Sequence, residues 1–261
     1  MEQKSENIVF MHIPKNAGTT LDSILDKNFL PENVFNVKVI DNKGLNLDEL
    51  FNLGEEAAKK IKLLKGHVPF GVHERLKGET KYITLLRNPV DRIISYYYYV
   101  LSLPNHRLYE RVKNENMSLY DFVTKIDQGD VNNAQTRVIS GIEDTSEKML
   151  EKAMSNIENH FSVVGLVEKY DESLILLQYK HGLKIPYYKS LNKTPNRKSA
   201  NEIDQKTLDA IVQLNDADIE LYQTMEKKFN KELENLNFLG LKLQKLRTMN
   251  GLYKVYSNTK K

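Results

Sequence analysis

A short apolar run that leads into a glycine-containing loop constrains this chain more than any other feature of its sequence. Residues 8–13, Ile-Val-Phe-Met-His-Ile, have the composition of a buried strand, and they continue directly into Pro14-Lys15-Asn16-Ala17-Gly18-Thr19-Thr20 and a helical pattern. The unpaired N–H groups and the dipole at a helix N-terminus attract anions, and Lys15 adds a full positive charge. The segment therefore predicts a binding site for a phosphate-like anion.

The position of the lysine separates this loop from the ATP- and GTP-binding loop. In G-x-x-x-x-G-K-[ST] the lysine follows the second glycine, whereas Lys15 precedes Gly18, the single glycine of the segment. One glycine also excludes the dinucleotide pattern G-x-G-x-x-G. His-Ile-Pro-Lys-Asn-Ala-Gly-Thr-Thr instead resembles the phosphosulfate-binding loop of carbohydrate sulfotransferases that use 3′-phosphoadenosine 5′-phosphosulfate (PAPS). The resemblance implies that the whole loop binds this co-substrate: Lys15, Asn16, Ala17, Gly18, Thr19 and Thr20.

Length and composition limit the class of protein. We expect a single domain over residues 1–261, with a basic tail at 241–261. A net charge of +3 is too small to predict binding to nucleic acid or to a membrane surface. The chain shows no apolar run of membrane-spanning length, no signal-peptide pattern and no cysteine. We therefore expect a cytoplasmic protein without membrane insertion, similar to a bacterial-type relative of the anchored, disulfide-containing enzymes of animal cells.

Alternating apolar runs and helical patterns predict the fold class. Four runs have the character of buried strands: 8–13, 61–68, 82–86 and 163–167. Helices are expected at 20–27, 47–60, 90–103, 119–127, 146–159, 172–181, 205–214 and 216–233. This alternation predicts an α/β fold, a parallel β-sheet flanked by helices on both faces. The family resemblance implies the sulfotransferase fold, which is similar to that of P-loop nucleotide kinases.

A second candidate anion site follows the third predicted strand. Arg87 ends that strand at the carboxyl edge, where open α/β sheets bind ligands, and Pro89 begins a helix that carries Ser95. An arginine at a strand end followed by a serine on the next helix resembles the 3′-phosphate motif of PAPS sulfotransferases. The resemblance implies a bidentate pair between Arg87 and the 3′-phosphate, and a hydrogen bond from Ser95.

Other charged and aromatic residues near these motifs have several interpretations. Arg92 is expected to form a surface ion pair, and of the four tyrosines Tyr96–Tyr99 two are expected to pack inward and two to lie at the surface. The segment 191–197 resembles the late loop that covers the nucleotide in this family, which makes Arg197 a candidate for 3′-phosphate binding and Lys193 a weaker one.

Asn-Ala-Gln-Thr-Arg at 133–137 resembles a segment of the bacterial members, and Arg137 has two interpretations. It binds a carboxylate or sulfate of the acceptor, as arginines of this region do in the family, or it fixes its own loop.

Sulfuryl transfer needs an acceptor hydroxyl that loses its proton, and a cation at the leaving phosphate. Lys15 suits the second task. His67 suits the first, because it ends the second predicted strand at the edge where Lys15 and Arg87 emerge, and because histidine titrates near neutral pH. Gly-His-Val at 66–68 also resembles the strand-end histidine of uronyl 2-O-sulfotransferases, which implies a base. His73, beyond a Pro-Phe-Gly turn, is the alternative base or an acceptor ligand.

These features predict an O-sulfotransferase that moves the sulfuryl group of PAPS to a hydroxyl of a sugar or polysaccharide precursor. The product would be 3′-phosphoadenosine 5′-phosphate (PAP), and no metal is required in principle. Two alternatives stay open. An ATP-dependent small-molecule kinase would need a magnesium-binding acid at a strand end, where only Glu168 is available. A non-catalytic protein could keep the nucleotide site alone.

Overall fold

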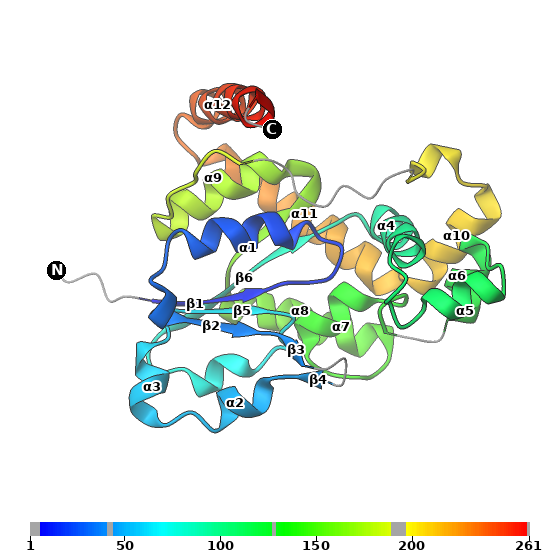
Figure 1. Ribbon diagram of the computed structural model, residues 1–261, viewed down its shortest axis with the longest axis horizontal. Coiled ribbons are helices and arrows are strands. Elements are labelled where there is room, and N and C mark those ends of the chain that lie inside the picture. The colour runs from blue at the N-terminus through cyan, green and yellow to red at the C-terminus, as the bar shows by residue number, and fades with distance from the viewer. Residues whose placement is uncertain (1–5, 41–43, 127–128, 189–196, 260–261) are drawn as a thin grey trace.

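The computed structural model describes residues 6–40, 44–126, 129–188 and 197–259, which form an α/β fold around one parallel sheet (Figure 1). The sheet has the strand order β2-β5-β1-β6-β7, and every neighbouring pair is parallel. The strands are β1 (Asn7–Met11), β2 (Val34–Val37), β5 (Leu63–Gly66), β6 (Thr80–Leu86) and β7 (Phe161–Leu166). A separate antiparallel pair joins β3 (Val39–Ile40) to β4 (Gly44–Leu45). Since β1 lies between β5 and β6, the loop after β1 emerges between the segments that follow those two strands.

The four strands predicted from apolar runs are confirmed as β1, β5, β6 and β7. The edge strand β2 was not predicted from the sequence. Its sequence is Val-Phe-Asn-Val, and only its last residue is buried. It therefore lacks the continuous apolar run that marks a strand covered on both faces.

Helices cover both faces of the sheet, as predicted. Figure 1 shows α1 (Gly18–Asp26) and α9 (Tyr170–His181) on one face, and α7 (Ala134–Ser140) and α8 (Ser146–His160) on the other. The remaining helices are α2 (Leu47–Phe51), α3 (Glu55–Lys60), α4 (Pro89–Ser102), α5 (Tyr109–Asn114), α6 (Leu119–Lys125), α10 (Gln205–Leu214), α11 (Asp216–Glu234) and α12 (Leu239–Thr259). Helix α11 packs against α7, α8 and β7, whereas α4, α5, α6 and α10 pack together beside the carboxyl edge.

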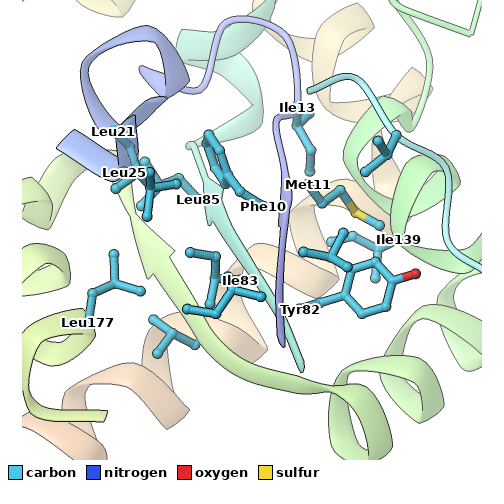
Figure 2. Close-up of a cluster of buried hydrophobic side chains, with 14 of the residues drawn as sticks. Phe10, Met11, Ile13, Leu21, Leu25, Tyr82, Ile83, Leu85, Ile139 and Leu177 are labelled. Carbon is cyan, nitrogen blue, oxygen red and sulfur yellow. The ribbon is translucent and has the colours of Figure 1, made fainter. Parts of the chain in front are cut away.

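The core lies on both sides of β1. Phe10 and Met11 are both buried and point to opposite faces, as successive strand residues do. Figure 2 shows Phe10 with Leu21 and Leu177 on the face covered by α1 and α9, and Met11 with Ile139 on the face covered by α7. A strand packed on both faces is held firmly, so the loop that follows it starts from a fixed position.

Some helices differ from the sequence prediction. The expected helix at 47–60 is two helices, α2 and α3, with Gly54 preceding the second. Helices α5 and α7 were not predicted. They have six and seven residues, respectively, which is too few to show a 3.6-residue period. The basic tail forms α12, which packs on α9. No helix in the described ranges is long and apolar enough to cross a bilayer.

Candidate functional site

The loop between β1 and α1 holds its backbone in a conformation that few side chains adopt. Lys15 has φ of 71° and Ala17 has φ of 54°. A non-glycine residue in this left-handed region costs about 1–3 kcal/mol, and such residues turn backbone N–H groups toward a common point. Ala17 directly precedes α1, and its side chain makes no capping hydrogen bond to the start of that helix. The strained backbone therefore has the form of an anion-binding loop.

Gly18 is needed in this loop because another side chain lies against it. A Cβ atom added at Gly18 would sit 2.0 Å from Cδ2 of His12. The His12 ring has little room to move, since it stacks on Phe10 at 5.5 Å and lies 4.7 Å from the His67 ring, measured between centroids. Only glycine fits beside this ring.

We expect Gly18→Ala to lower the free energy of unfolding by about 1–3 kcal/mol, the usual cost of overpacking a rigid site. Gly251→Ala is the matched control, because Gly251 is also helical but has no atom within 4 Å of an added Cβ. That control should stabilise the protein by up to about 1 kcal/mol through helix propensity. Urea unfolding of both variants measures the difference, and equal effects would mean that the His12 ring moves aside freely.

Hydrogen bonds join the loop to the segment after β6. The guanidinium of Arg87 donates from Nη1 to the carbonyl oxygen of Lys15 at 2.9 Å. The Asn16 amide donates to the carbonyl oxygen of Leu85 at 2.7 Å. The two anion motifs predicted from the sequence are therefore in direct contact. Oδ1 of Asn16 is buried without a partner in the described part of the chain, so the loop retains an unused polar atom.

Gln135 at the start of α7 bridges the two motifs. Its Oε1 accepts from the Asn16 amide at 2.7 Å and from the Arg87 backbone N–H at 2.9 Å, and its Nε2 donates to the Arg87 carbonyl at 2.9 Å. Asp218, which is buried, accepts from the backbone N–H of Gln135 and fixes its position. The roles of Gln135 and Asp218 are not visible in the sequence, because only the fold brings these residues to the loop.

Helix α4 follows Arg87 and contains Ser95. Asn88 caps the helix, since its Oδ1 accepts from the N–H groups of Val90 at 3.0 Å and Asp91 at 3.3 Å, and Pro89 occupies the first helical position. Ser95 is buried on this helix. The cap therefore fixes both the strand end with Arg87 and the helix with Ser95.

Basic side chains converge on the loop. The Lys15 ammonium lies 3.7 Å from the centroid of the Tyr99 ring. Burial, with the neighbouring Arg87, Arg92 and Arg197 as smaller causes, lowers the pKa of Lys15 to about 8. Burial likewise lowers the pKa of Arg87 to about 10, with Arg197 as the second cause. This concentration of partly desolvated positive charge favours a multivalent anion.

Arg197 lies beside this cluster and forms an ion pair with Asp91 of α4. Lys193 and the rest of the predicted covering loop up to Asn196 lie outside the described residues.

His67 follows the last residue of β5 and is exposed. Its Nδ1 lies 2.7 Å from the carbonyl oxygen of His12. A carbonyl oxygen only accepts, so Nδ1 carries a proton, and in the neutral ring Nε2 is the nitrogen with the lone pair. Burial lowers the pKa of His12 to about 3, with smaller contributions from His67, Lys65 and Lys15. The His12 ring is therefore neutral beside His67.

Strand β5 is tied to the loop helix by a buried lysine. Lys65 is only 1% exposed, and its ammonium contacts Asp22 at 2.9 Å and Asp26 at 2.7 Å, both on α1. These ion pairs fix the strand that carries His67 against the helix that follows the anion loop.

His73 lies in a different aromatic cluster. Its Nδ1 is 2.9 Å from the Tyr82 hydroxyl, and its ring lies 4.7 Å from that of His160 and 5.3 Å from that of Phe70. The ring contacts of His73 thus run to these residues, whereas those of His67 run to the base of the anion loop.

The structure tests the sequence predictions for Arg92 and for the four tyrosines of α4. The expectation that Arg92 forms a surface ion pair is wrong, because Arg92 is 1% exposed and donates from Nη1 to the backbone carbonyl of Asp130 at 3.0 Å. The tyrosines pack against the fold, but not as two inward and two surface rings: Tyr96 is buried and the other three are half-buried, and the Tyr97 hydroxyl donates to the carbonyl of Met117. Tyr99 has the additional contact with Lys15 that the sequence does not predict.

The contacts of Arg137 on α7 agree with the interpretation that it fixes its own loop, and acceptor binding by Arg137 stays a prediction. It forms an ion pair with Glu143 and donates to the carbonyl of Asn132 at 3.3 Å, so it fixes its own surroundings. It also lines a cavity next to Pro14 of the anion loop.

The parallel sheet, the strained loop after its central strand and the basic cluster at its carboxyl edge together suit a phosphate-bearing ligand at that edge. The chain belongs to the sulfotransferase family, whose family model matches residues 1–224. Among solved structures, the chain is similar to mouse sulfotransferase SULT7A1 complexed with PAP, at 12% identity and a TM-score of 0.40. That match covers 84% of this chain and 68% of the other. A search of curated proteins found no match.

Proposed function

We propose that this sulfotransferase moves the sulfuryl group of PAPS to a hydroxyl of a carbohydrate acceptor. The observation that carries the proposal is the hydrogen bond from Arg87 to the carbonyl of Lys15. It joins a loop suited to the 5′-phosphosulfate with an arginine suited to the 3′-phosphate, as a nucleotide with both groups requires. The Asn16 Oδ1 atom without a partner and the converging cations support a ligand that is polar and strongly anionic.

The nucleotide side of the site uses the residues around the anion loop. The loop and helix start from Lys15 to Thr20 bind the phosphosulfate, and Arg87 forms a bidentate pair with the 3′-phosphate. Ser95 and Arg197 complete the 3′-phosphate site, because α4 carries Ser95 and the Arg197 ion pair with Asp91 holds this arginine beside α4.

The transfer step uses two side chains. His67 Nε2 accepts the proton of the attacking hydroxyl, and the hydroxyl oxygen forms a bond to sulfur as the bond from sulfur to the bridging oxygen breaks. Lys15 neutralises the charge that develops on that bridging oxygen, which leaves with PAP. His67 suits the base role better than His73, since the carbonyl of His12 fixes its tautomer with Nε2 unprotonated.

The kinase alternative has less support. Both carboxylate oxygens of Glu168 have partners: Oε1 accepts from the backbone N–H of Asn88 and Oε2 from the hydroxyl of Tyr222. The acid that such a kinase would offer to magnesium is therefore used to fix α4 and α11.

Transfer of label from ³⁵S-PAPS to a panel of neutral and acidic oligosaccharides tests the proposal. We expect label in a carbohydrate product, together with release of PAP. Transfer of ³²P from γ-labelled ATP to the same panel, with no transfer of ³⁵S, would contradict it.

PAP binding should take up a proton at alkaline pH. The pKa of Lys15 in the free protein is about 8, and an anionic ligand raises it, so at pH 8.5 the free lysine is mostly neutral and the bound lysine is charged. Uptake of up to about three quarters of a proton follows. Calorimetry in two buffers of different ionisation enthalpy measures the uptake. Lys15→Arg should abolish it, and equal uptake by the wild type and this variant would assign the proton to another group.

A further inference from the structure

Helix α12 lies outside the part of the chain that the family model matches. The match ends at residue 224, whereas α12 spans Leu239–Thr259. Figure 1 shows α12 on the outer side of α9, with which it is in contact. None of the nucleotide-binding or transfer roles proposed above uses this helix. Its surface therefore needs an explanation that the sulfuryl chemistry does not supply.

One face of α12 holds the helix on the rest of the fold. Leu246 on this face is buried and Leu243 is half-buried. Arg247 adds ion pairs to two acids in the first turn of α9, Asp171 at 3.0 Å and Glu172 at 2.7 Å. These contacts fix the rotation of α12 about its own axis, so its opposite face points to solvent in a defined direction.

The opposite face of α12 carries exposed apolar side chains. Leu241, Leu252 and Val255 are 66%, 59% and 65% exposed. Their spacing puts all three on one side of a helix with 3.6 residues per turn, on the side away from Leu246. We call these three residues the apolar stripe. Single exposed apolar residues are ordinary, but a stripe along one helix marks a surface that contacts an apolar partner or phase.

All charged residues of α12 are cationic. They are Lys242, Lys245, Arg247 and Lys254, and the sequence contains no aspartate or glutamate after Glu234. Lys245 lies one turn after Leu241, at the side of the apolar stripe, and both Lys242 and Lys245 are exposed. Neither of these two lysines forms an ion pair with a described residue. The small net charge of the whole chain therefore conceals a local concentration of positive charge.

This charge decides which partner fits the apolar stripe. A second copy of α12 packed against the stripe would bring the lysines of both copies together, and like charges repel. A membrane that contains anionic lipids offers phosphate groups to the lysines and acyl chains to the leucines. An apolar stripe flanked by lysines is the pattern with which helices lie in the plane of such a membrane.

We propose that α12 docks the protein on the surface of a membrane that contains anionic lipids. The apolar stripe lies at the boundary between headgroups and acyl chains, and Lys242 and Lys245 contact the lipid phosphates. The face with Leu246 and Arg247 stays on α9, so docking requires no unfolding of the helix from the fold. This inference does not depend on the identity of the donor or the acceptor.

Co-sedimentation with lipid vesicles tests the proposal on the full chain. Vesicles of phosphatidylcholine and phosphatidylglycerol in equal parts are compared with vesicles of phosphatidylcholine alone. We expect a partition coefficient at least about tenfold higher on the anionic vesicles. It should fall between about 0.1 M and about 1 M NaCl, because the Debye length shortens from about 10 Å to about 3 Å. Equal binding to both kinds of vesicle, or binding to neither, would overturn the proposal.

A double substitution of the apolar stripe tests its part in docking. Leu241→Gln with Leu252→Gln should lower the partition coefficient on anionic vesicles by at least about tenfold, because two apolar side chains no longer enter the bilayer. Leu30→Gln with Val212→Gln is the matched control, since both residues are exposed and apolar but lie outside α12. Equal binding by the stripe variant and the control would overturn the assignment to α12.

A second pair of variants tests the lysines. Lys242→Gln with Lys245→Gln should weaken binding to anionic vesicles by about thirtyfold. The control, Lys227→Gln with Lys228→Gln, removes the same charge from two exposed positions on α11 and should change binding by less than about threefold. The same loss in both variants would assign binding to the overall charge of the protein and would overturn the proposal.

Sedimentation velocity without lipid tests the competing partner. We expect the wild type and the variant with Leu241→Gln and Leu252→Gln to show the same oligomeric state at every concentration. A concentration-dependent dimer that this variant abolishes would assign the apolar stripe to a second copy of the chain, and it would overturn the membrane proposal.

Discussion

Replacing His67 by alanine is expected to reduce sulfuryl transfer by about 10²–10⁴-fold, the usual contribution of a general base. The reason is geometric. The Nδ1–H of His67 donates to the carbonyl oxygen of His12, with 2.7 Å between nitrogen and oxygen, which leaves Nε2 as the acceptor, and His67 follows β5 beside the central strand. The affinity for PAP should stay within about twofold, since His67 is assigned to the acceptor side. Single-turnover transfer and calorimetric PAP titration separate the two effects.

His73→Ala is the comparison for this experiment. It removes the same type of side chain from the cluster with Tyr82 and His160, and transfer should stay within a few-fold of wild type. A His67→Ala protein with more than a tenth of wild-type activity would remove His67 from the mechanism, and a large loss in His73→Ala would assign the base to that residue.

The second large effect is expected at Arg87. Arg87→Met should weaken PAP binding by about a hundredfold, because it removes the bidentate, charge-assisted partner of the 3′-phosphate. Binding of AMP, which lacks only that phosphate, should change much less. The ratio of the two dissociation constants isolates recognition of the 3′-phosphate from any disturbance of the loop, to which Arg87 also donates a hydrogen bond.

Arg87→Lys sharpens the interpretation of this result. A lysine keeps the positive charge but loses the paired donors, so an intermediate ratio of PAP to AMP affinity is expected. The same fall in PAP and AMP affinity in Arg87→Met would mean that Arg87 supports the loop and does not bind the 3′-phosphate.

The parts of the fold that depend on local pattern were predictable. A strand buried on both faces is a continuous apolar run, so β1, β5, β6 and β7 are visible in the sequence. The edge strand β2 and the short helix α7 are not, because the first has only one buried residue and the second is too short to show periodicity. The family and its sulfuryl chemistry follow from the loop motif, and the match over residues 1–224 supports them.

The supporting residues of the site were not predictable, because their roles arise from contacts between distant segments. Gln135 has the sequence context of an ordinary helix residue, yet it bonds both Asn16 and Arg87. For Arg92 the sequence predicted a surface position, and the structure shows a buried one. Its neighbour Asp91 suggested a surface ion pair, whereas the packing of α4 buries the guanidinium and pairs Asp91 with Arg197. Burial of a charged side chain depends on tertiary packing, which a local charge pattern does not contain.

An equilibrium titration of the wild-type protein with PAP, AMP and ATP tests the central claim most directly. The contact between the loop and Arg87 predicts selectivity for the nucleotide that carries both a 5′- and a 3′-phosphate. PAP should therefore bind about a hundredfold more tightly than AMP, and more tightly than ATP, without added metal. Binding of ATP in preference to PAP, or equal binding of PAP and AMP, would contradict the account.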